Sequence, residues 1–338
     1  MSRKWNNIFF GFGLAALILM AAGIDMDEAR DALKSASYRF PLVILLWALL
    51  YILNTAAWYL IINAGGRSGI KFGWLYKVTV SGFALNYATP GGLMGGEPYR
   101  VMELKPHIGV ERASSSVILY VMTHIFSHLL FWLMSVLICL LTQPADALTA
   151  SVMAATTVFC ALGVWFFISC YRTGLASRLI NLTRHMPMLK KRMEAFAARN
   201  REKIENIDRQ TAALHTQSKS RFAAAVMLEL ACRFCSVAEI YIIITLMSPG
   251  VSYVQCILIL AFTSLFANLL FFMPLQIGGR EGGFLMSAAS LGAGAGAGIF
   301  TALIVRLREL VWTGIGLLLM KADRKCHNSN TARDRKIY

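Results

Sequence analysis

Two stretches decide the fold: Asn86-Tyr-Ala-Thr-Pro-Gly-Gly-Leu-Met-Gly-Gly-Glu97 and Asn268-Leu-Leu-Phe-Phe-Met-Pro-Leu-Gln-Ile-Gly-Gly-Arg-Glu281. In each, a Pro is followed after three or four residues by Gly-Gly and then by Glu. The apolar segments 74–89 and 253–273 run into these stretches, and another apolar piece follows each of them. Because proline and glycine interrupt helices, and broken backbone at membrane depth is tolerated only where it lines a cavity or is buried, both stretches predict interrupted helices.

The sequence around the two stretches is strongly apolar. Of its 338 residues 57% are hydrophobic and 15% are charged, with a mean hydropathy of +0.57, which exceeds what one soluble core needs. About 20 apolar residues in a helix cross about 30 Å of hydrocarbon. Six runs have about this length: Ile8–Ile24, Pro41–Asn63, Ala113–Leu141, Ser151–Tyr171, Phe222–Met247 and Ile299–Met320. We therefore predict an all-α integral membrane protein with about six full transmembrane helices and two re-entrant hairpins.

The first of these runs has a second interpretation. It follows Arg3 and Lys4 and carries small residues, Ala21 and Gly23, near its end, as a signal peptide does. We favour a retained first span because further spans follow it.

The basic residues orient the predicted spans. Segment 25–39 holds four acids and three bases, segment 172–221 four acids and twelve bases, and the tail from residue 321 two acids and six bases. Because Lys and Arg are enriched in cytoplasmic loops, we expect the middle segment and both termini on the cytoplasmic side of the inner membrane. Hairpin 74–112 then enters and leaves from the cytoplasmic side and hairpin 253–292 from the outer side. The two would be an inverted repeat around a site near the midplane.

This topology predicts four parts. Residues 1–171 form a first membrane half, 172–221 a basic cytoplasmic linker, 222–320 a second membrane half, and 321–338 a basic cytoplasmic tail. The central part of the linker, Met188–Ala213, is compatible with a helix lying on the anionic leaflet, or the linker is a solvated basic loop. Either placement accounts for the formal charge of +15 without nucleic acid as a partner.

The interrupted helices carry the candidate site. The glycines before Glu97 and Glu281 leave backbone N–H groups free at a helix start, and Arg100 and Arg280 add planar donors, which suits a phosphate or carboxylate. Alternatively, the glutamates only cap their helices and pair with these arginines, with no ligand. The candidate substrate-binding or coupling residues are Asn86, Pro90, Gly95, Gly96, Glu97, Arg100, Asn268, Pro274, Gly278, Gly279, Arg280, Glu281, Glu239 and Arg306.

Further ionisable residues lie within the predicted spans. Glu229 and Arg233 have the i, i+4 spacing of a pair on one helical face. Glu239 then needs a cavity, a water or a cation from another helix, and the last span offers candidate partners: Arg306, Arg308 and Glu309.

Metal binding and enzymatic chemistry find little support in the sequence. His124 and His128 also have i, i+4 spacing; such a pair can bind metal or relay protons, but a polar contact between helices is the simpler interpretation. Cys232 and Cys235 have CxxC spacing without further ligands, so we assign them to packing. We expect no metal and no cofactor. Neither HExxH, GxSxG nor a dinucleotide fingerprint in strand–helix context occurs, which favours a transporter over an enzyme.

Segments 89–100 and 274–283 resemble the paired signatures of the lysylphosphatidylglycerol synthase transmembrane-region family, also described as flippase-like domain proteins. The resemblance extends over nearly the whole chain. In that family the membrane domain of the multiple peptide resistance factor is taken to translocate aminoacylated phosphatidylglycerol and is fused to an aminoacyl-transferase domain, which we do not find here. Leu275-Gln276 departs from the more usual Pro-Gly-Gly of the second signature.

The resemblance implies a lipid translocase that moves an anionic or lipid-linked head group. The expected partners are a membrane lipid that bears phosphate, the anionic leaflet under the basic linker, and a lipid-synthesis enzyme. Two alternatives remain: an integral-membrane transferase or accessory subunit of lipid or glycolipid synthesis with a glutamate as general base, or a membrane scaffold whose linker recruits a partner enzyme.

Overall fold

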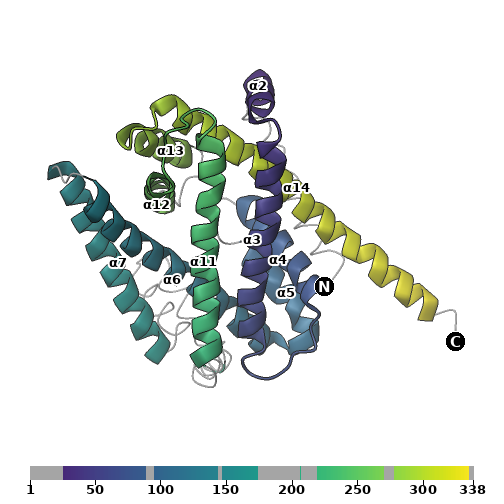
Figure 1. Ribbon diagram of the computed structural model, residues 1–338. Coiled ribbons are helices and arrows are strands. Elements are labelled where there is room, and N and C mark those ends of the chain that lie inside the picture. Colours follow the sequence, from purple (N-terminus) through teal and green to yellow (C-terminus); the bar gives the residue numbers. More distant parts are fainter. Residues whose placement is uncertain are drawn as a thin grey trace, which may run out of the picture. The chain divides into compact units, whose positions relative to one another are not determined.

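The computed structural model describes residues 26–88, 95–143, 147–173, 206, 219–269 and 278–334. All regular secondary structure in these residues is helical, in agreement with the predicted all-α class. The helices, coloured along the sequence in Figure 1, are α2 (Met26–Ala36), α3 (Arg39–Ile62), α4 (Phe72–Ala88), α5 (Gly96–Ile108), α6 (Val110–Thr142), α7 (Ala147–Thr173), α11 (Lys219–Ile244), α12 (Tyr253–Leu269), α13 (Gly279–Ser290) and α14 (Ala295–Asp334).

Five of the six predicted spans coincide with helices. Three stretches, Arg39–Ile62, Val110–Thr142 and Thr149–Ser169, are long and apolar enough to cross a membrane. The predicted spans 222–247 and 299–320 lie on α11 and α14, which carry several charged residues each. The predicted span 8–24 lies outside the described residues. The chain is thus an all-α membrane protein, and the number of crossings stays a prediction.

Both interrupted helices have the same helix–break–helix form. Helices α4 and α12 have 17 residues each, and the helices that follow them, α5 and α13, have 13 and 12. The intervening residues 89–94 and 270–277 lie outside the described part of the chain. A helix of 17 residues is about 25 Å long, short of about 30 Å of hydrocarbon. These lengths suit re-entrant segments, whose sides of the membrane stay predictions.

The chain divides into two compact units. The first contains Met1–Thr55, Lys71–Glu103 and Phe234–Tyr338, and the second contains Ala56–Ile70 and Leu104–Arg233. The first unit thus takes residues from both sides of the basic linker. Beyond the linker, the second unit takes only the first part of α11, up to Arg233. The predicted division into sequence halves is a statement about topology, which this grouping does not test.

The first unit has an aromatic core where α3, α4 and α14 meet. Its buried residues are Tyr51, Val80 and Trp312, and the rings of Tyr51 and Trp312 have centroids 4.9 Å apart. Helix α14 packs closely on α4, since a Cβ atom at Gly316 would lie 2.5 Å from the Cβ of Ala84. This close packing fixes α4, which leads into the first interrupted stretch.

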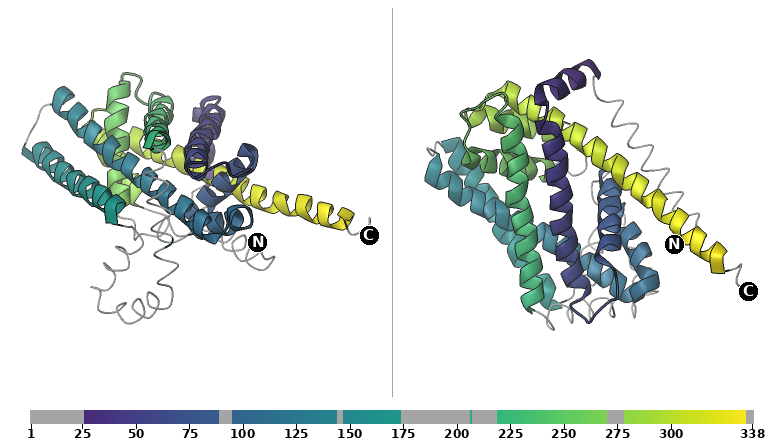
Figure 2. Two further views of the ribbon diagram at one scale, coloured as in Figure 1. Left: turned by 90° about the horizontal axis from the view of Figure 1, so that it is seen from below. Right: turned by 45° about the vertical axis from the view of Figure 1, so that its right-hand side comes forward.

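The second unit has α6 and α7 side by side, as both views in Figures 1 and 2 show. The rings of Phe126 and Phe167 stack with centroids 4.6 Å apart. Gly163 on α7 faces Leu129, whose nearest methyl would lie 2.9 Å from an added Cβ. The two helices therefore form a closely packed apolar pair.

Candidate functional site

The second interrupted stretch ends in a glycine turn that starts α13. Gly278 has a φ of +84°, which favours glycine, and its N–H donates to the Glu281 Oε2 atom at 2.8 Å. Glu281 therefore satisfies one of the N–H groups that a helix start leaves without a partner. The same carboxylate also forms an ion pair with Arg306 of α14.

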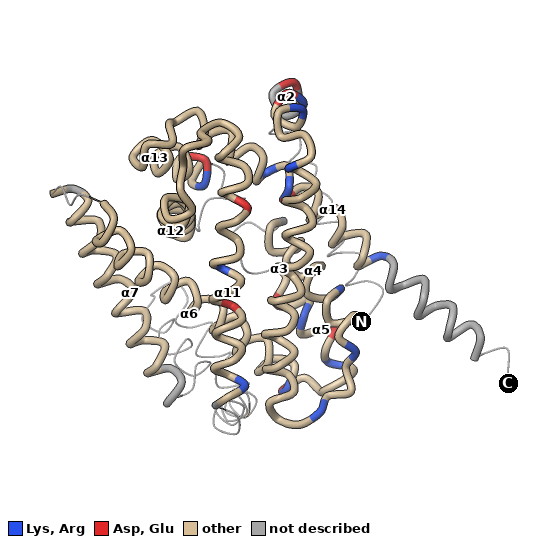
Figure 3. Tube along the Cα trace, in the orientation of Figure 1, with Lys and Arg blue, Asp and Glu red and all other residues tan. Residues whose placement is uncertain are grey.

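Six charged side chains gather around this turn, and we call them the charged cluster. They come from α11, α13 and α14, and Figure 3 shows charged positions on all three helices. Three are arginines and three are glutamates, so the cluster has no formal net charge. The ion pairs are Arg280–Glu309, Arg306–Glu281, Arg308–Glu239 and Arg308–Glu309.

The pair Arg308–Glu239 forms the buried inner part of the cluster. The Arg308 Nε and Nη2 atoms donate to the two carboxylate oxygens of Glu239 at 2.9 and 3.3 Å, and Trp47 Nε1 donates to Oε2 at 2.8 Å. The Arg308 guanidinium also lies over the Trp47 ring, 3.8 Å from its centroid. The side chains of Arg308 and Glu239 are only 3% and 4% exposed. Of the cavity, water or cation that Glu239 was expected to need, the structure shows a cation from another helix, and it is Arg308, one of the candidate partners named from the sequence.

The pairs Arg280–Glu309 and Arg306–Glu281 form the outer part of the cluster. The side chains of Arg280 and Glu281 are 24% and 39% exposed, whereas Arg306 is 12% and Glu309 5% exposed. Each pair joins α13 to α14, which also pack on each other. A ligand would therefore reach Arg280 and Glu281 before it reached the inner pair.

The first interrupted stretch forms its own polar network at the start of α5. Asn86 accepts a hydrogen bond from the Gly96 N–H at 2.7 Å and donates to Glu97 at 2.9 Å. Glu97 also pairs with Arg100 at 3.3 Å. Arg100 is 1% exposed and fits against α4 where Gly82 lacks a side chain, because a Cβ there would lie 2.5 Å from the Arg100 Nε atom. This network favours a positioning role for Arg100 over direct contact with a ligand.

The two stretches use their shared residues differently. Glu97 is bound by residues of its own hairpin. Glu281 and Arg280 instead form ion pairs with α14, to Arg306 and Glu309. Asn268 is exposed and donates to the Ser264 carbonyl at 2.7 Å, so it does not reproduce the role of Asn86. Gly95 and Gly279 are buried. The predicted site residues Pro90 and Pro274 lie outside the described residues.

Both stretches nevertheless contribute to the same unit. All the candidate residues that the structure describes belong to the first unit. Tyr87, next to Asn86 at the end of α4, lies within electrostatic range of both Arg280 and Arg308. Sequence reasoning missed Tyr87, Trp47 and the role of Gly82, because nothing in their local sequence indicates which helix they face.

Comparison with known protein families decides the class. The family model "Lysylphosphatidylglycerol synthase TM region" matches residues 8–316, which is most of the chain. This chain belongs to that family. No curated protein and no solved structure matched. The family identifies a membrane protein of lipid-related processes, in agreement with the resemblance of segments 89–100 and 274–283.

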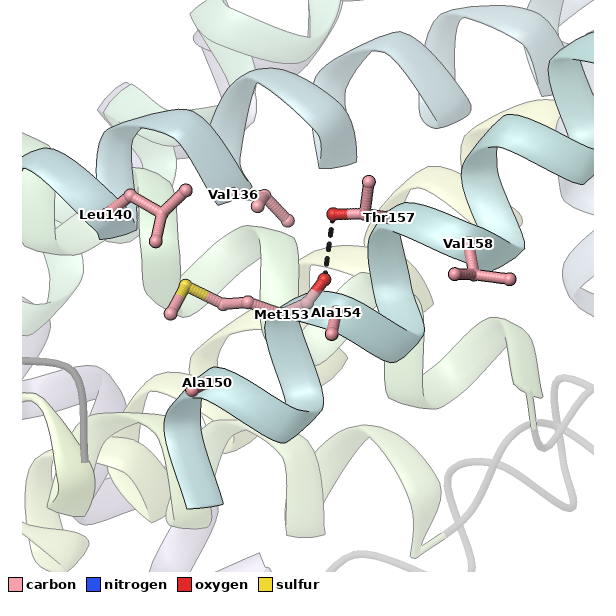
Figure 4. Close-up of a pocket in the computed structure, with 7 residues that line it drawn as sticks. All are labelled: Val136, Leu140, Ala150, Met153, Ala154, Thr157 and Val158. Atoms are coloured by element: carbon pink, nitrogen blue, oxygen red, sulfur yellow. Dashed lines mark hydrogen bonds between the residues drawn. The ribbon is translucent and has the colours of Figure 1, made fainter. Parts of the chain in front are cut away.

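One shallow pocket of this family member lies between α6 and α7 in the second unit (Figure 4). The Thr157 hydroxyl, drawn at its edge, donates to the Met153 carbonyl at 2.8 Å. The lining residues carry no charge: Val136, Leu140, Ala150, Met153, Ala154, Thr157 and Val158. The pocket therefore suits hydrocarbon rather than a charged head group.

The second unit of this family member contains a separate polar group that joins α6 to α11. His124 lies 2.8 Å from Glu229 and 2.6 Å from Arg233. The predicted polar contact between helices is thus confirmed for His124. The sequence spacing that pairs Glu229 with Arg233 does not reveal that a histidine of another helix binds both. No group of three metal-ligating side chains occurs among the described residues.

Proposed function

We propose that this protein binds a phosphate-bearing lipid head group at the outer part of the charged cluster and moves it across the membrane. The observation that carries the proposal is the arrangement of Arg280 and Arg306. Arg280 lies at the start of α13 and Arg306 on α14, and each forms an ion pair with a glutamate in which one side chain is partly exposed. Membership of the lipid-related family supports a lipid as the ligand.

The energetics of buried charge favour this use of the outer pairs. Ionisable side chains at membrane depth are expensive, so they usually serve a ligand or ion pathway. An arginine presents a planar fork that matches a phosphate, and such charge-assisted bonds are about twice as strong as neutral ones. A phosphate can take the place of Glu309 or Glu281 at the arginines, and it keeps the guanidinium groups paired while it is bound.

The other contacts suit supporting roles. The inner pair Arg308–Glu239 is buried and fully oriented, so it holds α14 to α11 while the outer pairs open. Arg100 and Glu97 hold the first interrupted stretch against α4. Movement of the head group would require the outer pairs to exchange partners as access alternates between the two sides of the membrane.

The proposal includes a topology in the inner membrane with both termini cytoplasmic, six full crossings and two opposed hairpins. The distribution of basic residues and the short lengths of α4 and α12 support it. In a cysteine-free background, a thiol introduced by Ser220→Cys at the start of α11 should react with an impermeant reagent only from the cytoplasmic side. A thiol introduced by Gly250→Cys should react only from the outer side. The opposite pattern contradicts the topology.

The function is tested in proteoliposomes that contain head-group-labelled lipids with and without phosphate. We expect the protein to accelerate leaflet exchange of phosphate-bearing lipids and the Arg280→Gln variant to lose this acceleration. Arg39→Gln is the matched control, because Arg39 donates to the Ile242 carbonyl and the Thr245 hydroxyl at 3.1 and 3.0 Å, away from a carboxylate. Exchange at the protein-free rate for every lipid contradicts translocation. A new lipid product formed by the purified protein would instead support the transferase alternative.

A further inference from the structure

The strongest feature outside the proposed lipid site is the polar group between α6 and α11 in the second unit. His124 lies near the middle of α6, a helix of 33 residues that is apolar enough to cross the membrane. The Glu229 side chain is 0% exposed and that of His124 21%. Arg233, one turn along α11 from Glu229, has its Nη2 atom 2.6 Å from Nε2 and 3.1 Å from Nδ1 of His124.

The contacts of His124 favour its neutral form. A carboxylate oxygen can only accept, so Nδ1, which lies 2.8 Å from Glu229, carries a hydrogen and donates to it. The Arg233 guanidinium lies beside the ring, close to both nitrogens, and its positive charge favours an Nε2 atom without a hydrogen. His124 is neutral in this arrangement. The charges of Glu229 and Arg233 then balance, as is needed for an ion pair at membrane depth.

We propose that His124, Glu229, Arg233 and His128 form a proton-binding site within the membrane, and that this proton is the coupling ion of the lipid movement proposed above. The second statement rests on the proposed function, whereas proton binding by the site does not. Histidine is the side chain whose ordinary titration range makes it suited to this task.

Proton binding would change the contacts of Arg233. A proton delivered by water bonds to the lone pair of His124 Nε2, and the new N–H group then meets the N–H donors of Arg233. Two donors and two positive charges at 2.6 Å repel each other, so Arg233 must withdraw. The Nδ1–H···Glu229 hydrogen bond remains and becomes charge-assisted. The site therefore has two states, with Arg233 docked on His124 or withdrawn.

His128 offers a second position for Arg233. Its ring lies edge-on to that of His124, with centroids 5.3 Å apart. Its buried Nδ1 atom has no hydrogen-bond partner among the described residues, and Arg233 is within electrostatic range of it. The titratable and charged groups recorded around His124 are Tyr120 and His128 on α6 and Glu229 and Arg233 on α11.

Helix α11 carries residues of both sites: Glu229 and Arg233 of the proton site, and Glu239 of the charged cluster. A change at Arg233 that shifts or rotates α11 would therefore be carried to the inner pair of the cluster.

Proton binding is tested without any lipid assay. Nitrogen-15 spectra of histidine-labelled protein in nanodiscs are recorded from about pH 5 to about pH 8, with His124 assigned through His124→Gln. We expect His124 to take up one proton in this range. Arg233→Gln should move its midpoint to a higher pH by about one unit or more, since one unit corresponds to tenfold in proton affinity. A His124 signal that stays neutral throughout, or a midpoint unchanged by Arg233→Gln, overturns the proposal.

Coupling is tested in the proteoliposomes used for lipid exchange, now with an imposed pH gradient. We expect the gradient to change the rate several-fold in the wild type and not in Glu229→Gln. The exposed His107 provides the control variant His107→Gln, which should behave as wild type. Lipid exchange that is independent of the gradient overturns coupling and leaves the proposed function standing. Absence of exchange in the wild type removes the proposed function, while the spectra still decide whether the site binds a proton.

Discussion

Arg308 donates two hydrogen bonds to the two carboxylate oxygens of Glu239, at 2.9 and 3.3 Å. Its guanidinium lies over the ring of Trp47, and the Trp47 Nε1–H group donates to the same carboxylate. Both members of this pair are buried in the first unit. A buried pair with two hydrogen bonds between its members orients its helices firmly, but it need not be the most stable solution, because desolvation of two charges opposes their attraction. This distinction gives a prediction about stability that is separate from lipid binding.

Removal of one member of this pair should destabilise the protein strongly. In Arg308→Met, Glu239 is left buried without its cation, which costs roughly 3–5 kcal/mol in comparable cases. The double variant Arg308→Met with Glu239→Leu removes both charges of this pair and should recover most of the loss. The measurement is thermal unfolding of purified protein in detergent. A single variant as stable as wild type would show that the pair does not act as an anchor.

Gly82, the glycine of α4 on which Arg100 packs, predicts a contrast between two substitutions in one helix. An alanine at Gly82 places its Cβ 2.5 Å from the Arg100 Nε atom, so Gly82→Ala should cost roughly 1–3 kcal/mol by overpacking. Gly73→Ala is the control, since nothing lies within 4 Å of its Cβ position and alanine is the better helix former by about 1 kcal/mol. Unfolding of the two variants in detergent should therefore shift in opposite directions. Equal shifts would contradict the close contact between Arg100 and α4.

The packing of α14 on α4 predicts a second contrast, at two glycines only two residues apart. Gly316→Ala introduces a methyl group 2.5 Å from the Ala84 Cβ and 2.9 Å from the Val80 carbonyl oxygen, whereas Gly314 has open space. We expect Gly316→Ala to lower the unfolding temperature and Gly314→Ala to leave it unchanged or to raise it. Protease sensitivity of the α4 region provides an independent measurement. Tolerance of Gly316→Ala would mean that the two helices can separate without loss of stability.

Much of the fold follows from the sequence because membrane insertion depends on local quantities. Apolar length locates α3, α6 and α7 to within a few residues, and Pro followed by Gly-Gly locates the breaks before α5 and α13. The grouping into two compact units could not be predicted in this way. This grouping depends on which helices pack against each other, for example α14 on α4 at Gly316 and Ala84. No local pattern in a single sequence indicates such a contact.

The candidate site was predictable in composition but not in pairing. The Glu97–Arg100 pair follows from i, i+3 spacing. The partners of Arg280 and Glu281 lie on α14, 29 and 25 residues further along the chain, and spacing along one helix cannot indicate them. For the same reason, the sequence placed Arg306 rather than Arg308 among the site candidates, although Arg308 is the residue that binds Glu239.

A charge exchange between Arg280 and Glu309 separates a structural role of this pair from a role in lipid binding. Each single variant, Arg280→Glu or Glu309→Arg, leaves two like charges together on α13 and α14 and should destabilise the protein. The double variant restores one positive and one negative charge, so it should regain much of the unfolding temperature. If Arg280 only pairs with Glu309, the double variant also regains lipid exchange. If instead the Arg280 guanidinium binds phosphate from its 24% exposed position on α13, the double variant should be stable but inactive. Its arginine would then stand at position 309, where the native side chain is only 5% exposed. From there the guanidinium cannot reach the ligand. Stability and exchange measured on the same preparations decide between these outcomes.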